Sequence, residues 1–276
     1  MLKSKNLKQS FIFISMVIGL SYFVFWGPIA LLKLKTANLV DGKIYNIPAF
    51  IFFLIGGFVP SLTGIILTWV FERKEGLKKL FLSAINFKIG SPSLIIIIIY
   101  AISLGFLQLI LYTFLGGTLD YSQFIHQLPT ILPLIILGPL SEEFGWRGFL
   151  QKRISLEFSP ILGSIIIGVV WSLWHLPLFY MIGTSQHDFN IPFIPFMISL
   201  ICSSFIYTYL YYKSSGNLFA AILLHWITTY ILQVISSQIS RTPTYNFLEC
   251  IPALIIGCLF IKLLKNQRIL IKDNSK

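Results

Sequence analysis

Residues 130–151 read TILPLIILGPLSEEFGWRGFLQ, an apolar run interrupted by two prolines, two glutamates and an arginine. A membrane-spanning helix needs about 20 mostly apolar residues, and this run has that length despite its charges. If it does not cross the membrane, every later segment changes sides. The topology of the chain therefore depends on this run.

The composition indicates an integral membrane protein. Hydrophobic residues make up 56% of the 276, and 11% are charged, against roughly 25% in soluble proteins. The mean hydropathy is +0.82. We predict an all-α polytopic membrane protein, one transmembrane bundle over 1–276 with about eight transmembrane helices. The expected spans are 11–32, 47–71, 93–116, 130–151, 159–182, 192–212, 217–236 and 248–266.

The basic residues test this count through the positive-inside rule. With eight spans and both termini cytoplasmic, sixteen Lys and Arg fall on inner segments and four on outer loops. Omitting the span at 130–151 would invert everything after it, so we predict that it crosses. The first apolar run is interpreted as a helix rather than a removed leader, because no small-residue cleavage site follows it.

The formal net charge of +11 is spread between apolar runs and not gathered in one patch or tail. We therefore expect the lipid bilayer, and no nucleic acid, as the partner of these charges. The three cysteines lack the spacing of a zinc cluster or a disulfide framework. Within the second expected span, Gly56, Gly57 and Pro60 predict a kink or a close helix contact.

Apart from Glu249, Lys262 and Lys265 near the two ends of the last expected span, five charged or histidine residues lie inside the expected spans. Glu142, Glu143 and Arg147 are in the fourth, His175 is in the fifth and His225 is in the seventh. Such groups are costly in lipid, so they face the interior of a bundle or a watery cavity. Each cluster alone is compatible with simple interhelical bonding. Together they contain what a hydrolytic site needs, namely a base for water and donors or metal ligands for an oxyanion.

The spacing within these clusters suggests separate roles. Glu143 and Arg147 are four residues apart and can pair on one helix face. Glu142 points away from that face and has no local cation, which suits a general base. His225 and Thr229 also share a face.

Three motifs follow one another on these spans, namely Glu142-Glu143-x-x-x-Arg147, Trp171-x-x-x-His175 and His225-x-x-x-Thr229. In this order they resemble the CAAX protease and bacteriocin-processing (CPBP or Abi) family of intramembrane proteases, whose archetype is the type II CAAX prenyl endopeptidase. The motif region covers 137–230. The departure is Thr229, where the family usually has Asn or Asp, and this puts the reaction rate in doubt.

The resemblance implies an intramembrane endopeptidase that uses a Glu-activated water. Glu142 would act as the base, assisted by His175. His225, helped by Thr229, would stabilise the oxyanion. The substrates would be membrane-associated peptides or proteins, in CAAX-like, bacteriocin, leader or signalling-peptide processing or in self-immunity.

The same resemblance leaves the metal open, because the family is described both as metalloproteases and as glutamate proteases. Glu142, His175 and His225 permit a divalent metal such as zinc, but they lack the HExxH spacing that would require one. Glu143 and Arg147 would orient the substrate.

The chain size fits the bacterial branch of the family, in the plasma membrane as a multi-pass protein. The first alternative is a catalytically weak or inactive member that acts as a membrane scaffold or regulator, which Thr229 alone supports. The second is a transporter or channel with a proton relay, against which the absence of internal repeats argues.

Overall fold

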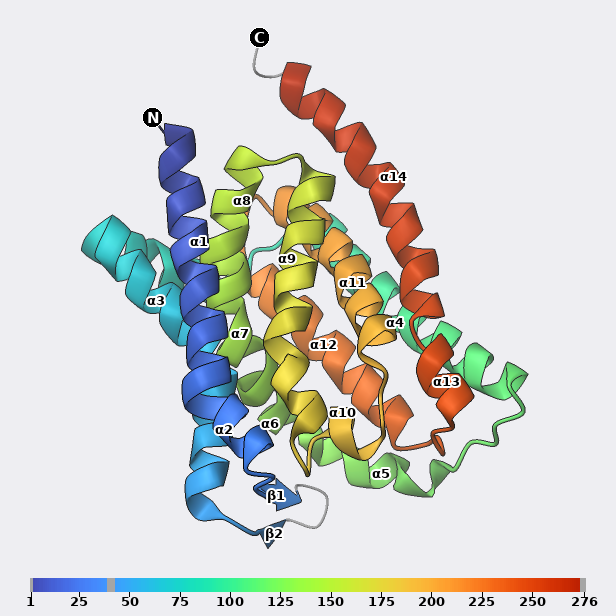
Figure 1. The fold of residues 1–276 in the computed structure, drawn as a ribbon. Coiled ribbons are helices and arrows are strands. Elements are labelled where there is room, and N and C mark those ends of the chain that lie inside the picture. The colour runs from blue at the N-terminus through green and yellow to red at the C-terminus, as the bar shows by residue number, and fades with distance from the viewer. Residues whose placement is uncertain (1, 39–42, 274–276) are drawn as a thin grey trace.

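A computed structural model describes residues 2–38 and 43–273. Its helices form one bundle, and the two described chain ends lie at the same end of it (Figure 1). Within the described residues, eight helices are long and apolar enough to cross a membrane: Lys5–Leu31, Ile47–Ala84, Ser91–Phe114, Phe124–Glu157, Pro160–Tyr180, Phe193–Lys213, Leu218–Ser236 and Pro243–Lys265. The expected all-α polytopic fold is confirmed, and the cytoplasmic position of the termini stays a prediction.

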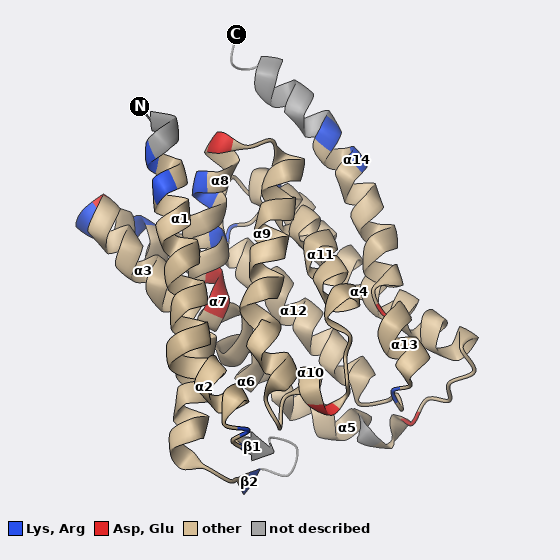
Figure 2. Ribbon diagram, in the orientation of Figure 1, with Lys and Arg blue, Asp and Glu red and all other residues tan. Residues whose placement is uncertain are grey.

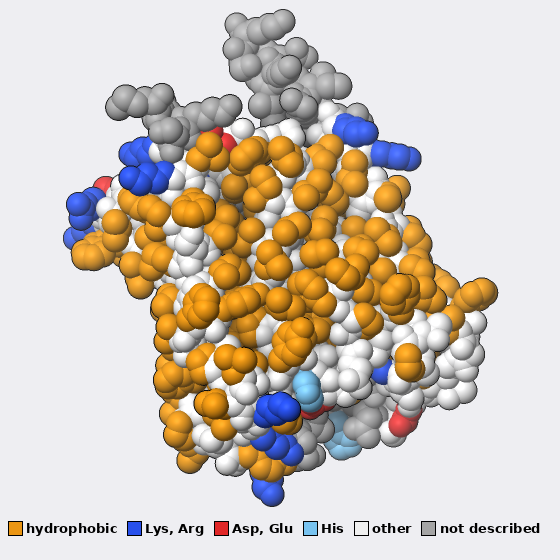
Figure 3. All heavy atoms as spheres, viewed as in Figure 1, with side chains coloured by type: hydrophobic (Ala, Val, Ile, Leu, Met, Phe, Trp, Pro, Cys, Tyr) orange, Lys and Arg blue, Asp and Glu red, His pale blue; other side chains and the backbone are white. Residues whose placement is uncertain are grey.

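The outer surface agrees with a lipid environment. Figure 3 shows apolar side chains over most of one face of the bundle, with the Lys and Arg side chains near its two ends. Phe11, Phe23 and Phe114 are exposed by 71%, 82% and 85% of their surface. A water-soluble protein rarely exposes so continuous an apolar surface. The chain is therefore a multi-pass membrane protein.

The first span has a π-helical turn near its end and is followed by a small hairpin. Its parts are α1 (Leu2–Leu20), the π-turn η1 (Ser21–Phe25) and α2 (Trp26–Leu31). The antiparallel pair β1 (Ala37–Asn38) and β2 (Lys43–Ile44) follows, with Ala37 opposite Ile44. Sequence hydropathy gives no signal for such short strands.

The helix α3 (Ile47–Ala84) is two helices joined by a break. Asn46 caps its start, because the Asn46 side chain accepts from the backbone N–H of Ala49. The helix is broken at Arg73, where φ is 57° and ψ is −158°. A positive φ is rare in a residue with a side chain. The expected span 47–71 therefore ends at the break, and α4 (Ser91–Phe114) begins after a turn at Gly90.

The fourth span is the least regular. It contains α5 (Phe124–Gln127), η3 (Leu128–Thr130), α6 (Ile131–Ile135), η4 (Ile136–Leu140), α7 (Ser141–Glu143), η5 (Phe144–Gln151) and α8 (Lys152–Glu157), preceded by η2 (Tyr121–Gln123). Of these, η4 and η5 are π-helical. Pro139 explains the first π-turn, because proline has no N–H and its ring displaces the carbonyl four residues earlier.

The remaining helices complete the bundle around this span. They are α9 (Pro160–His175), η6 (Leu176–Tyr180), α10 (Ser185–Asp188), α11 (Phe193–Lys213), α12 (Leu218–Ser236), α13 (Pro243–Leu248) and α14 (Ile251–Asp273). Ser159 caps α9 and Asn217 caps α12 through their side-chain oxygens. Each cap satisfies a backbone N–H that the first helical turn leaves unpaired.

Glycines set how closely α3 approaches the irregular span. A Cβ atom on Gly64 would lie 2.6 Å from the Cα of Gly145, so the two backbones touch. Gly56 likewise faces the indole of Trp26, which donates to the carbonyl of Phe53 at 2.9 Å. The close helix contact expected near Gly56 is therefore present, between α2 and α3, while the contact of Gly64 with Gly145 fixes η5 against α3.

Candidate active site

Glu142 occupies a cradle of two indoles inside the bundle. It lies on α7, which Figure 2 shows as an acidic segment between the two ends of the molecule. Its Oε2 accepts from Trp146 Nε1 at 3.2 Å and from Trp171 Nε1 at 2.6 Å. Only 6% of Glu142 is exposed, and it makes no ion pair with any described residue. Neutral donors therefore hold this carboxylate.

Glu143 is at the centre of a different network. Its Oε1 accepts from Arg147 Nη1 at 3.1 Å and lies 2.7 Å from His225 Nδ1. Glu143 has no exposed surface, and Arg147 is 3% exposed. The predicted pairing of Glu143 with Arg147 is confirmed. The bond from α12 to Glu143 links the third motif to the first.

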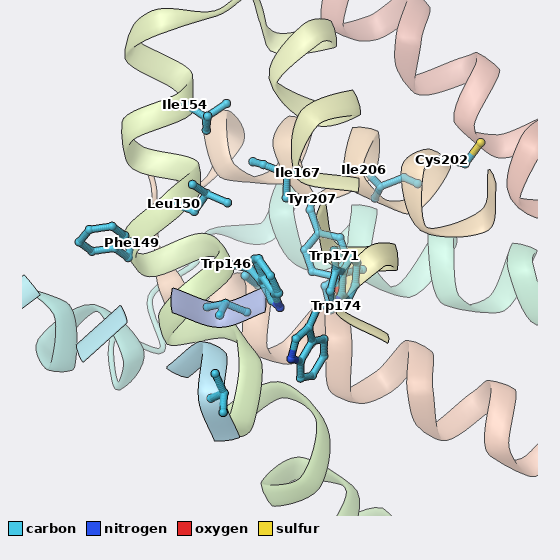
Figure 4. Packing of buried hydrophobic residues seen from close by; sticks show 14 of the residues in the cluster. Trp146, Phe149, Leu150, Ile154, Ile167, Trp171, Trp174, Cys202, Ile206 and Tyr207 are labelled. Carbon is cyan, nitrogen blue, oxygen red and sulfur yellow. The ribbon is translucent and has the colours of Figure 1, made fainter. Parts of the chain in front are cut away.

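The guanidinium of Arg147 is held between two aromatic rings. Its Cζ lies 4.3 Å from the ring centroid of Trp171 and 3.7 Å from that of Tyr207, which meet edge to face. Figure 4 shows Trp171, Trp174 and Tyr207 close together beside Trp146. Arg147 Nε and Nη2 have no hydrogen-bond partner among the described residues. Arg147 therefore keeps unused donors in a buried place.

His175 is the last residue of α9, and a backbone carbonyl one helical turn earlier fixes its ring. Its Nδ1 lies 2.8 Å from the carbonyl oxygen of Trp171, one turn earlier. The imidazole packs edge to face on Trp174 and Phe196, with ring centroids 4.5 and 5.3 Å apart. Trp171 thus contacts two predicted catalytic residues, Glu142 through its indole and His175 through its carbonyl.

His225 is near the middle of α12 and is 7% exposed. Its second nitrogen, Nε2, faces Gly138, where an added Cβ would lie 3.7 Å from it. Thr229 lies one turn further along α12 and is half-buried. No hydrogen bond of the described residues involves the Thr229 hydroxyl, so Glu143 is the bonded partner of His225 here.

A metal ion needs several ligands converging on one point. In the described part of the chain, no group of three or more His, Cys, Asp or Glu side chains is arranged to hold one. The expected donor set of Glu142, His175 and His225 is therefore not brought together as a ligand group in this arrangement. Two of the expected donor atoms have other partners instead. His225 Nδ1 bonds to Glu143, and Glu142 Oε2 accepts from two indoles. Zinc at this site stays a prediction.

Two uncharged residues of this site, Trp146 and Tyr207, were not among the predicted site residues. Trp146 follows Glu142 by four residues, so the helical spacing alone could have found it. Tyr207 lies on the sixth span, α11, which has no buried charge or histidine. Its contact with Arg147 depends on how α11 packs, for which the sequence gives no signal.

Comparisons with known proteins agree with the motifs. Residues 124–231 match the family model of the type II CAAX prenyl endopeptidase Rce1-like proteins. The chain is also 28% identical over 166 residues to CAAX prenyl protease 2 of Methanococcus maripaludis. That alignment covers 56% of this chain and 60% of the relative. The family resemblance that the motifs predict is therefore confirmed.

Proposed function

From this similarity to type II CAAX prenyl endopeptidases, we propose that the chain is an intramembrane endopeptidase that hydrolyses peptide bonds of membrane-associated proteins or peptides. The observation that carries the proposal is Glu142, a buried carboxylate without a cation, held by two indole N–H groups. A carboxylate is costly to bury in a membrane bundle, so its presence there favours a functional role. The proposed catalytic region is 137–230.

Glu142 is the proposed general base. Both indoles bind the same oxygen, Oε2, so Oε1 is the oxygen assigned to water, which must come within about 3 Å of it. Glu142 takes a proton from the water as the water oxygen bonds to the peptide carbonyl carbon. The C–N bond of the tetrahedral intermediate then breaks, and the proton passes to the leaving amine.

His175 is proposed to assist the base. With its Nδ1–H donated to the Trp171 carbonyl, the neutral ring carries its lone pair on Nε2. That nitrogen can accept a proton or a hydrogen bond, which is the property a helper of Glu142 needs. The backbone bond thus supports one tautomer of His175.

His225 is proposed to stabilise the oxyanion. Its Nδ1 is directed at the Glu143 carboxylate, and in the imidazolium form its Nε2 also donates. Nε2 faces Gly138, where the missing side chain leaves room for a substrate carbonyl. Thr229 is the proposed second donor from the same helix face. Donors already held in place cost no reorganisation when charge develops on the oxygen.

Glu143 and Arg147 are the proposed substrate-orienting pair. Glu143 fixes both His225 and Arg147. The two unpaired nitrogens of Arg147, Nε and Nη2, suit an acceptor such as the carboxylate at the C-terminal end of a peptide. The substrate classes proposed are CAAX-like peptides and bacteriocin, leader or signalling peptides, and the bacterial plasma membrane stays a prediction.

The test compares wild type with Glu142→Gln in membranes that lack the endogenous protein. Mass spectrometry would record the released peptides and shortened membrane proteins. The matched control is Glu75→Gln, because Glu75 is exposed and outside the site. We expect products from wild type and the control, and none from Glu142→Gln. Equal products from all three would remove Glu142 from catalysis.

One observation favours a second function. Thr229 makes no hydrogen bond with any described residue, and it replaces the usual Asn or Asp. A scaffold or regulator that retains the fold without efficient cleavage would agree with this. Glu142→Gln distinguishes the two, because a regulator would keep its partner function after the substitution whereas a protease would lose cleavage.

A further inference from the structure

A basic pocket lies between the end of α3, the start of α4 and the turn from α11 to α12. Its volume is about 690 Å³. Three lysines line it, namely Lys79, Lys88 and Lys213, together with serine hydroxyls and asparagine amides. None of these residues belongs to the candidate active site, and the proposed mechanism uses none of them.

The charge of this pocket is unbalanced. All three lysines are exposed, no Asp or Glu lines the pocket, and no ion pair of the described residues involves any of the three. Like charges brought together repel one another, so a concave surface with three unpaired ammonium groups favours an anion.

The hydroxyl groups add donors suited to several anionic oxygens. Ser83 Oγ accepts from the backbone N–H of Leu218 at 2.9 Å, which leaves its own O–H free to donate. Ser215 is exposed in the turn, with a φ of 53°. Asn217 Nδ2 donates to the carbonyl of Asn86 at 3.0 Å and joins the two walls of the pocket. The walls are thus held in place before any ligand arrives.

Large apolar side chains are exposed beside the lysines. Leu82, Ile85 and Phe87 are 52%, 62% and 70% exposed, and Leu82 itself lines the pocket. Phe87 packs edge to face on Phe219 of α12, with ring centroids 4.7 Å apart. Alternating basic and apolar side chains are typical of segments that lie in the membrane interface. A free anion would use the lysines and leave these side chains without a partner.

We propose that this pocket binds the phosphate headgroup of an anionic phospholipid, with the acyl chains running over Leu82, Ile85 and Phe87. Basic pockets between transmembrane helices bind such headgroups. Lys79 and Ser83 also line an adjoining cavity of about 120 Å³ that Arg147 borders. The bound lipid would therefore lie beside a cavity that Arg147 borders.

The test measures lipid retained by the purified full chain, using native mass spectrometry after exchange into micelles with equal phosphatidylglycerol and phosphatidylcholine. The pocket variant is Lys79→Gln/Lys88→Gln/Lys213→Gln. The matched control removes the same charge from the opposite end of the bundle, at Lys33, Lys35 and Lys43. All six lysines are exposed, so both variants are expected to fold.

We expect wild type and the control to retain phosphatidylglycerol preferentially and the pocket variant to lose affinity roughly a hundredfold. Equal loss in both variants would reduce the effect to diffuse electrostatics and overturn the site. Leu82→Ser/Phe87→Ser tests the contacts with the acyl chains. This variant should retain less ligand if the ligand is a phospholipid, and as much as wild type if the ligand is a free anion.

Two further arms identify the source of the anion. Excess inorganic phosphate should not displace the lipid at millimolar concentration, and an acidic peptide without an acyl chain should not compete. Displacement by either would overturn the lipid assignment in favour of that ligand. The readout needs no peptide cleavage, so its failure is separate from a failure of the proposed protease function.

Discussion

Arg147→Met is expected to destabilise the protein far more than the loss of a surface charge would. Arg147 and Glu143 are 3% and 0% exposed, and their Nη1 and Oε1 atoms are 3.1 Å apart. Removing one member of a buried ion pair costs about 3–5 kcal/mol, because the other charge is left uncompensated. Glu143→Gln is expected to cost a similar amount, since it leaves the guanidinium buried without a carboxylate.

The double variant Arg147→Met/Glu143→Gln leaves neither charge buried. Its loss should come mainly from the two cation–π contacts with Trp171 and Tyr207, each worth about 0.5–2 kcal/mol. We therefore expect the double variant to be no less stable than either single one, with a coupling energy of at least about 3 kcal/mol. Coupling of about 3 kcal/mol is at the upper end of the range for residues in direct contact.

The assay is unfolding of the purified protein in mixed micelles of increasing denaturing detergent, followed by circular dichroism. Lys152→Met serves as the control, because its side chain is 51% exposed and pairs with Glu72 at 2.9 Å. An exposed pair contributes at most about 1 kcal/mol. If the two single losses simply added in the double variant, the reasoning about a buried, mutually dependent pair would be refuted.

Three other outcomes are expected. Gly145→Ala should lower the free energy of unfolding by about 1–3 kcal/mol through overpacking against α3, whereas Gly19→Ala, with no atom within 4 Å of its Cβ, should not lower it. Trp171→Phe keeps an aromatic ring but removes the 2.6 Å bond to Glu142, so the rate of peptide hydrolysis should fall roughly tenfold with the fold retained. An unchanged rate would exclude a positioning role for Trp171. Cleavage should persist after dialysis against a chelator, and a loss that only zinc restores would show that the expected donor set does assemble.

Most of the fold could be predicted from the sequence because hydropathy and basic residues are strong, independent signals. The charged run 130–151 lies within Phe124–Glu157, a helix long and apolar enough to cross a membrane, in agreement with the lysine and arginine pattern. The break at Arg73 could not be predicted, because neither proline nor glycine marks it. Glu72, next to the break, pairs with Lys152 and Arg153 of α8. The break is therefore next to contacts between residues far apart in the sequence.

In the site, too, contacts within one helix could be predicted from the sequence, and contacts between helices could not. The Glu143–Arg147 pair follows from helical spacing and was predicted. The bond from His225 to Glu143 was not, because it depends on the rotation of α12 against α7. Sequence spacing suggested Thr229 as the partner of His225, whereas packing provides a carboxylate.

The two indoles that hold Glu142 also give the protein an optical property. The chain has six tryptophans, and the N–H groups of two of them point at one buried carboxylate oxygen. Indole fluorescence and near-ultraviolet dichroism respond to the charge and hydrogen bonding of the N–H group. Protonation of Glu142, or arrival of a substrate at it, would therefore change the emission of Trp146 and Trp171. The events at this carboxylate can be followed by light in the unlabelled protein.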